Sequence, residues 1–139
     1  MWFGSAIGRL LARVFKGRLV EQSLPDAAVQ LWLVRRLVPK WAIGQAWGNV
    51  ILLHEDRWDT PDTEALLLHE FRHVLQWRRF GNVFLVIYPL CSLWAGVRHG
   101  PRMAYWMNRF EREARGECEA KGRSRRRHRS PVESDTKER

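Results

Sequence analysis

The chain has 139 residues, of which 45% are hydrophobic, including eight Trp and six Phe, so it can fold as one domain around its own core. Its formal net charge is +9, yet no groove-reading module or aromatic-interleaved basic face is evident, so nucleic acid is not an expected partner. Two widely separated cysteines, Cys91 and Cys118, argue against a disulfide framework and a thiolate zinc knuckle, and they favour a reducing, cytoplasmic location.

Residues 1–18 are predicted to contain an amphipathic, basic helix. Apolar residues recur from position 2 to position 15 at three- and four-residue spacing, with Arg9, Arg13 and Lys16 between them. Arg9 and Arg13 interrupt the apolar run that a secretory signal needs. The helix either caps the core of the domain or lies on an anionic membrane surface. Packing is the commoner outcome, and peripheral membrane contact stays open.

The segment 25–38 begins with Pro-Asp and carries several apolar residues, which predicts a second short helix. The period then changes. Residues 41–47 and 49–54 flank a Gly-Asn pair, which predicts a β-hairpin. We therefore expect an α+β fold that is mainly helical, with a short hairpin or sheet before the longest helix.

That longest helix is predicted from Thr60 to Gly81, because Thr60 and Pro61 favour a helix start and Gly81 favours its end. It is apolar nearly all round, so it should be central and buried. Residues 83–97 form the most apolar run of the chain. This run is shorter than the roughly 20 residues that cross a bilayer and contains Pro89, so we expect buried or membrane-skimming helices.

The last helix is predicted from Pro101 to about Ala120, and the domain is expected to span residues 1–120. Residues 121–139 contain no Leu, Ile, Phe, Trp, Tyr or Met, so they are predicted to form a disordered tail. Five arginines between positions 123 and 129 are a density that attracts phosphates of nucleic acid or lipid. A solubilising role for this basic tail is the favoured interpretation.

The sequence His69-Glu70-Phe71-Arg72-His73 falls in the middle of the longest helix. Histidines four residues apart share one helix face, so His69 and His73 can bind one metal ion. Glu70 points to the side, where it can act as general base toward a water molecule that zinc activates for attack on a peptide carbonyl. Two buried histidines and a glutamate without partners would be costly, which favours one zinc ion per chain over satisfied core histidines.

A zinc site of this kind needs a third protein ligand, for which His54, His99, Glu111 and Glu113 are candidates. In the last predicted helix, an apolar arc places Glu111 at its edge and Glu113 on the opposite side. A buried carboxylate needs a cation, and a metal ion supplies one. The alternative for Glu111 is a salt bridge to Arg115 at the next turn.

His69 to Gln76 follow the pattern H-E-x-x-H-x-x-Q, and Glu111 to Ala114 follow E-x-x-A. These segments resemble the gluzincin type of zincin metallopeptidase, in particular the membrane prenyl-protein and heat-shock metalloproteases. Residues 41–115 are similar to the compact bacterial domain associated with contractile injection systems and polymorphic toxins. The resemblance implies that Glu111 is the third zinc ligand. It also implies an edge strand before the motif helix that pairs with a peptide or protein substrate, here through Asn49, Ile51 and Leu53.

Two features depart from those families. Arg115 stands where the membrane enzymes usually have an aspartate, and no motif supplies a group for the oxyanion, although Tyr105 and His99 are close in sequence. We expect a zinc-dependent peptidase with Glu70 as general base. The alternatives are a catalytically inactive, zinc-stabilised binding module and a peripheral membrane or delivery adaptor built on the first helix and residues 83–97.

Overall fold

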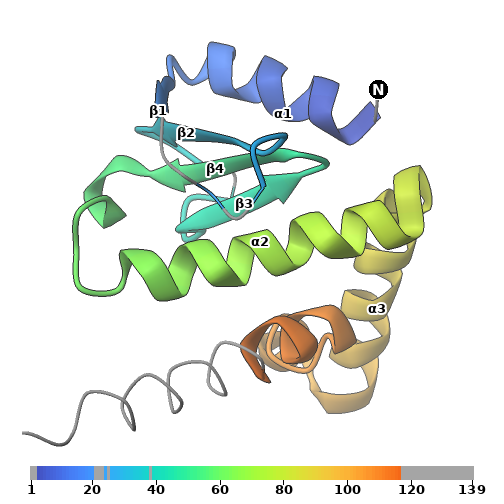
Figure 1. Cartoon of the computed structure of the whole chain (residues 1–139). Helices are drawn as coiled ribbons and strands as arrows, with labels where there is room; N and C mark the ends of the chain where they lie inside the picture. The colour runs from blue at the N-terminus through green and yellow to red at the C-terminus, as the bar shows by residue number, and fades with distance from the viewer. Residues whose placement is uncertain (1–2, 21–23, 25, 38, 117–139) are drawn as a thin grey trace, which may run out of the picture.

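In the computed structural model, two helices cover opposite faces of a four-stranded sheet (Figure 1). Residues 3–20, 24, 26–37 and 39–116 are described; Cys118 and the predicted tail, residues 121–139, lie outside them. The main elements are α1 (Phe3–Val14), β1 (Arg18–Val20), β2 (Gln30–Val34), β3 (Gly44–Trp47), β4 (Val50–His54), α2 (Thr63–Phe80) and α3 (Phe84–His99). Residues 109–116 form a last helical segment. The α+β class is confirmed.

The strand order is β1-β2-β4-β3, with β2 and β4 parallel and the other two pairs antiparallel. Val50 and Leu52 of β4 pack toward α1, whereas Ile51 and Leu53 pack toward α2. All four side chains are fully buried. A strand covered on both faces has a continuous apolar sequence, which explains the Val-Ile-Leu-Leu run.

The predicted hairpin is confirmed by the antiparallel pairing of β3 and β4. Gly48 occupies the first position of the two-residue turn with φ of 60°, a conformation that favours glycine. However, β4 is not the last strand on its side of the sheet. Because β2 pairs with the other side of β4, the prediction that residues 49–54 form the edge strand is wrong. Among the described strands, β3 and β1 are the edges.

The prediction of a helix over residues 25–38 is also wrong, because residues 30–34 form β2. Leu31 and Leu33 pack in the core cluster between the sheet and α2, whereas Trp32 and Val34 pack in the core cluster between the sheet and α1. A short segment with apolar residues on both faces suits a buried strand as well as a helix, and pairing with β4 decides between them here. The short edge strand β1 was not predicted.

The predicted first helix is confirmed, but it packs on the sheet through its small residues. Gly4, Ser5, Gly8 and Ala12 are buried, whereas the large side chains of Phe3, Leu10 and Val14 are exposed. Helix and sheet approach closely along this face, since a Cβ atom on Gly8 would lie 2.8 Å from the Cβ of Val50. The first helix therefore packs on the core of the domain, which is the first of the two alternatives given for it above.

The predicted longest helix is confirmed as α2, although it begins at Thr63 rather than just after Thr60. The last helix begins at residue 109 rather than at Pro101, because Pro101–Met103 form a 3-10 turn and residues 104–108 are irregular. Trp77, Phe84 and Phe110 pack together, and this cluster joins α2, α3 and the last helical segment.

Replacement of Gly8 by alanine tests the close packing of α1 on the sheet. Glycine costs a helix interior about 1 kcal/mol relative to alanine, so an unhindered Gly→Ala change stabilises. At Gly8 the added methyl group meets Val50 and Trp47 within 3 Å, and overpacking should lower the free energy of unfolding by about 1–3 kcal/mol. Denaturant unfolding measures the change. The control is Gly116→Ala, where no atom lies within 4 Å; equal stability of both variants would contradict this packing.

Candidate metal centre

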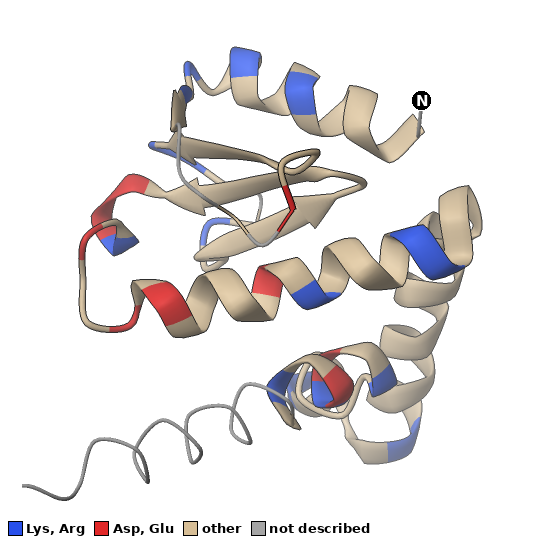
Figure 2. Cartoon of the chain, in the orientation of Figure 1, with Lys and Arg blue, Asp and Glu red and all other residues tan. Residues whose placement is uncertain are grey.

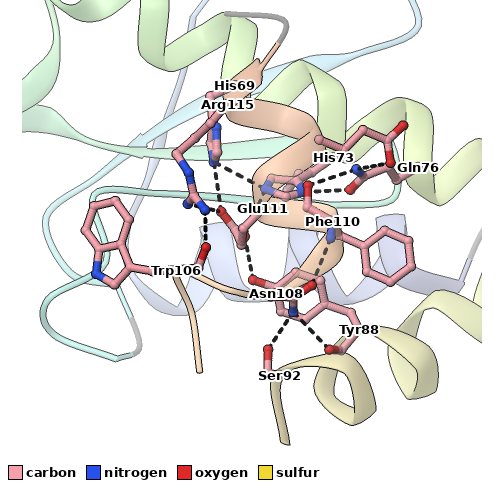
Figure 3. A network of polar contacts seen from close by, with 12 residues as sticks. His69, His73, Gln76, Tyr88, Ser92, Trp106, Asn108, Phe110, Glu111 and Arg115 are labelled. Atoms are coloured by element: carbon pink, nitrogen blue, oxygen red, sulfur yellow. Dashed lines mark hydrogen bonds and ion pairs between the residues drawn. The ribbon is translucent and has the colours of Figure 1, made fainter. Parts of the chain in front are cut away.

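His69 and His73 lie on the face of α2 that is turned toward the last helical segment (Figure 3). On the other side of α2, Leu67 and Val74 are held in the core cluster below the sheet, which fixes the rotation of the helix. The Nε2 atoms of the two histidines are 3.3 Å apart. The helix therefore directs two imidazole nitrogens to one point.

Glu111 reaches the same point from residues 109–116. One carboxylate oxygen lies 3.2 Å from Nε2 of His69, and the other lies 3.1 Å from Nε2 of His73. The residue is only 2% exposed. One ligand atom from each of the three residues lies within 4.8 Å of the others, close enough to hold a metal ion. Residues 42 positions apart in the chain, His69 and Glu111, are thus brought together.

The spacing of the two histidines fits a small tetrahedral ion. Ligand atoms about 2.0–2.1 Å from zinc lie about 3.3 Å apart in tetrahedral geometry. The two Nε2 atoms match that value at 3.3 Å, whereas the 3.2 and 3.1 Å contacts of Glu111 are made by two different oxygens. In addition, the Oε2 atom of Glu111 is buried without a hydrogen-bond partner, despite the nearby histidine nitrogen. The donor set and its orphaned oxygen fit a bound cation, although its identity is not shown.

Gln76 sets the orientation of His73. Its Nε2 donates to the carbonyl of Phe110 over 3.1 Å, and a carbonyl can only accept. The Oε1 of Gln76 must then be the atom that lies 2.8 Å from Nδ1 of His73, so this nitrogen carries a proton and donates. In the neutral ring, the lone pair consequently belongs to Nε2, which faces Glu111 and His69.

Two further residues position Glu111. Tyr88 on α3 donates its hydroxyl to a carboxylate oxygen over 2.5 Å. Asn108 is fully buried, and its Oδ1 accepts from the amide of Phe110 over 2.9 Å, as an N-cap of the last helical segment does. The amide group of Asn108 also donates to Ser92 and to the carbonyl of Tyr88. The helix that carries Glu111 is therefore anchored on α3 at its first turn.

Arg115 lies beside the cluster. Its Nη1 is 3.7 Å from Oε2 of Glu111, so the salt bridge predicted as an alternative coexists with the two histidine contacts. Its other guanidinium nitrogen donates to the carbonyl of Trp106, and the group lies against the rings of Tyr105 and Trp106. The arginine occupies the place where an aspartate was expected from the resemblance. Histidine orientation comes instead from Gln76.

The charges in the site perturb one another. Burial opposes ionisation of Glu111, but its close contacts with His69, His73 and Tyr88 more than offset this effect and hold its pKa well below the usual value. Burial would lower the pKa of His73, but the hydrogen bond to Glu111 and the nearby carboxylates raise it overall. Burial raises the pKa of Glu70, against the opposing effect of the histidines. A positive charge at the cluster thus stabilises the ionised form of Glu111.

Glu70 is buried beside the edge strand β3 rather than in the cluster. A Cβ atom added to Gly44 would lie 2.5 Å from its Oε1 and 2.9 Å from its carboxyl carbon. The strand can pass this close only because residue 44 has no side chain. A shallow, open depression of about 330 Å³ adjoins this region, and its lining includes Ile43, His69 and Arg115. The cluster is therefore open to solvent on the His69 side.

The other predicted site residues lie elsewhere. His54 ends β4 and accepts from the amide of Asp56, and His99 is exposed at the end of α3. Glu113 is exposed and accepts from Gln76 over 3.4 Å. None of the three belongs to the cluster found among the described residues.

The three residues assigned to substrate binding are not available for it. Ile51 and Leu53 are fully buried, and the side chain of Asn49 accepts from Arg78. This assignment is corrected, since β4 is paired along both sides. Sequence reasoning missed Gly44, Tyr88 and Asn108. An asparagine just before a helix is a recognisable capping signal, whereas nothing local marks the other two.

No protein-family model, curated protein or solved structure matches the chain. The resemblance to gluzincins therefore stays a prediction drawn from two short motifs. What is established is the convergence of His69, His73 and Glu111 in a geometry that can hold a metal ion. Any further chemistry has to be argued from the arrangement of these and neighbouring residues.

Replacement of Gln76 by leucine tests its control over His73. The change removes the acceptor for Nδ1, and loss of such a partner weakens metal affinity by roughly 10–100-fold. Competition with a chromogenic chelator measures the zinc affinity. Arg112→Leu, on the exposed side of the last helical segment, is the control and should leave the affinity unchanged. An unaltered affinity in the Gln76 variant would contradict this role.

Proposed function

We propose that the protein is a zinc-dependent peptidase of the zincin type. The observation that carries the proposal is the separation of two buried carboxylates. Glu111 joins His69 and His73 in the cluster, whereas Glu70 lies outside it, against the edge strand β3. Three ligands with an open side and a separate carboxylate are the parts that metal-assisted peptide hydrolysis requires.

Zinc suits this donor set because it accepts imidazole nitrogen and carboxylate oxygen in tetrahedral sites with an open fourth position. When bound, zinc would supply a Lewis acid that polarises the peptide carbonyl. The two histidines and Glu111 would hold it, and Gln76 and Tyr88 would keep these ligands in place. The cytoplasmic location expected from the cysteines is compatible with intracellular zinc chemistry but adds no support.

Glu70 is proposed as the general base. Its neighbours on α2, His69 and His73, fix its position relative to the cluster, and burial raises its pKa above that of an exposed glutamate. A carboxylate of raised pKa is a stronger base, so it takes a proton from the attacking water more readily and returns it to the leaving amine. Arg115 lines the open depression, where its guanidinium can balance negative charge that develops on the substrate.

The substrate is proposed to bind as an added strand along β3 (Gly44–Trp47). This strand pairs with β4 on one side, and no described strand pairs with its other side, although the carbonyl of Ala46 already accepts from Nε1 of Trp77. An extended peptide on that edge would pass next to Glu70, which touches the strand at Gly44. The depression near Ile43 and Leu66 is suited to an apolar side chain of the peptide. This assignment replaces the one to β4.

A second function is favoured by one observation. The cluster links α2 to residues 109–116, since the contacts of Glu111 with His69 and His73 cross between them. A metal ion there would cross-link two helices, as it does in a zinc-stabilised binding module without catalysis. In that case Glu70 would have no chemical role.

Substitution of the ligand and of the base separates the two functions. His69→Ala should abolish stoichiometric zinc binding, measured by elemental analysis of the purified protein. Glu70→Gln should keep one zinc ion per chain but reduce cleavage of an unstructured protein substrate by roughly 10²–10⁴-fold. Full zinc loading with no cleavage of a broad peptide library by the unaltered protein would favour the binding module.

Gly44→Ala probes the contact between the edge strand and the proposed base. The added Cβ would overlap Glu70, and displacement of a catalytic group by about 1 Å can cost about 100-fold in rate. We expect cleavage to fall by that order while zinc content stays unchanged. Gly116→Ala serves again as the control. If Gly44→Ala cleaves at the wild-type rate while Glu70→Gln is inactive, β3 does not constrain the position of the base.

A further inference from the structure

The helix α3 has an apolar surface on the side turned away from the protein. Its inner side is defined by Phe84, Tyr88 and Ala95, which pack toward α2 and the irregular residues before the last helical segment. On the outer side, six large apolar residues follow one another at helical spacing, the first of them just before α3: Val83, Val86, Leu90, Leu93, Trp94 and Val97. We call these six residues the α3 outer face.

The α3 outer face is far more exposed than a soluble helix normally allows. Leu93 is 64% exposed, Trp94 65% and Val97 75%. A surface helix of a soluble protein has polar residues on that side, because exposed apolar area is costly in water. Phe3, at the start of α1, is also exposed, and its amide donates to the side chain of Asn82 just before α3.

The charges in the sequence around α3 have one sign. Residues 71–110 contain six arginines and no aspartate or glutamate. Arg98 and Arg102 are exposed at the end of α3. The acidic residues of the neighbouring sequence gather instead at positions 55–64, around the start of α2 and at the opposite end of that helix from the start of α3 (Figure 2). An anionic surface would therefore meet Arg98 on α3 and Arg102 just after it, and no carboxylate from α3 itself.

We propose that the α3 outer face lies on the surface of an anionic lipid bilayer. The six apolar side chains would enter the boundary between headgroups and acyl chains, with Trp94 in the position that tryptophan favours at membrane interfaces. Arg98 and Arg102 would contact lipid phosphates. Two copies of this chain joined by the same face would bring like charges together, which makes self-association the weaker alternative.

The stretch Thr63–His99 is the one part of the described residues that is long and apolar enough to cross a membrane by length and composition. It is built from α2 and α3, however, and α2 carries the metal cluster and packs against the sheet. Only 11% of its most apolar window is buried inside the protein. A helix that lies flat on the membrane accounts for the exposed side of α3 and leaves the packing of α2 intact.

Flotation with lipid vesicles tests the proposal on the full chain, independently of metal and of cleavage. Vesicles of phosphatidylcholine with phosphatidylglycerol should carry the protein, and high salt should weaken this binding without abolishing it, because part of it is apolar. Leu90→Glu/Leu93→Glu should weaken binding by roughly tenfold or more, because two charges would enter the apolar boundary. Both positions are exposed, so the fold should persist, as circular dichroism will check.

Leu19→Glu, at an exposed position on β1, is the matched control and should bind as the wild type does. Lipids with brominated acyl chains should quench tryptophan fluorescence in the wild type and less so in Trp94→Phe, which reports insertion at that residue. Three results would overturn the proposal: no binding to anionic vesicles, equal binding by Leu90→Glu/Leu93→Glu, or complete loss of binding in high salt. If the protein does not bind vesicles but forms a dimer, and the double substitution dissociates that dimer, the α3 outer face is instead a contact with a second copy of the chain.

Discussion

The carboxylate of Glu111 is buried, and its negative charge is tolerated because His69, His73 and Tyr88 surround it. An unpaired carboxylate in that position would cost several kcal/mol or would take up a proton. The arrangement of the residues around Glu111 follows from this requirement. Asn108 caps the helix that carries Glu111, and Gln76 turns the lone pair of His73 toward it. A proton on His73 or a metal ion can supply the positive charge, so the two compete for one nitrogen.

The sheet contacts Glu70, beside the cluster, at a glycine. Because β4 pairs with β2 on one side and with β3 on the other, β3 forms an edge of the sheet, and Gly44 lets that edge pass beside Glu70. A larger residue at position 44 would separate the strand from the carboxylate. The same effect of a small residue operates on the other face of the sheet, where Gly8 admits α1 to close packing. In both places the absence of a Cβ atom determines which surfaces can meet.

Acidic residues and exposed apolar residues lie in different regions of the molecule. Carboxylates are concentrated before and at the start of α2, near the open side of the cluster (Figure 2), whereas α3 has one arginine, no carboxylate and several exposed apolar residues. The proposed substrate edge and the proposed lipid contact consequently use different elements, β3 and α3. A peptidase held to a membrane by α3 would keep its edge strand free for a peptide.

The sequence by itself determined α2, the hairpin, the two histidines with Glu70, and the choice of Glu111 among four candidates, because these depend on local periodicity, turn residues and helical spacing. Tertiary structure decided what local pattern cannot: that residues 30–34 form a strand, that β4 is internal, and that Gly44, Tyr88 and Asn108 complete the site. The physical reason is that an apolar segment has no preference for edge or centre until its neighbours are placed. Position in a sheet and contact across helices are properties of pairing, and pairing joins residues that lie far apart in the chain.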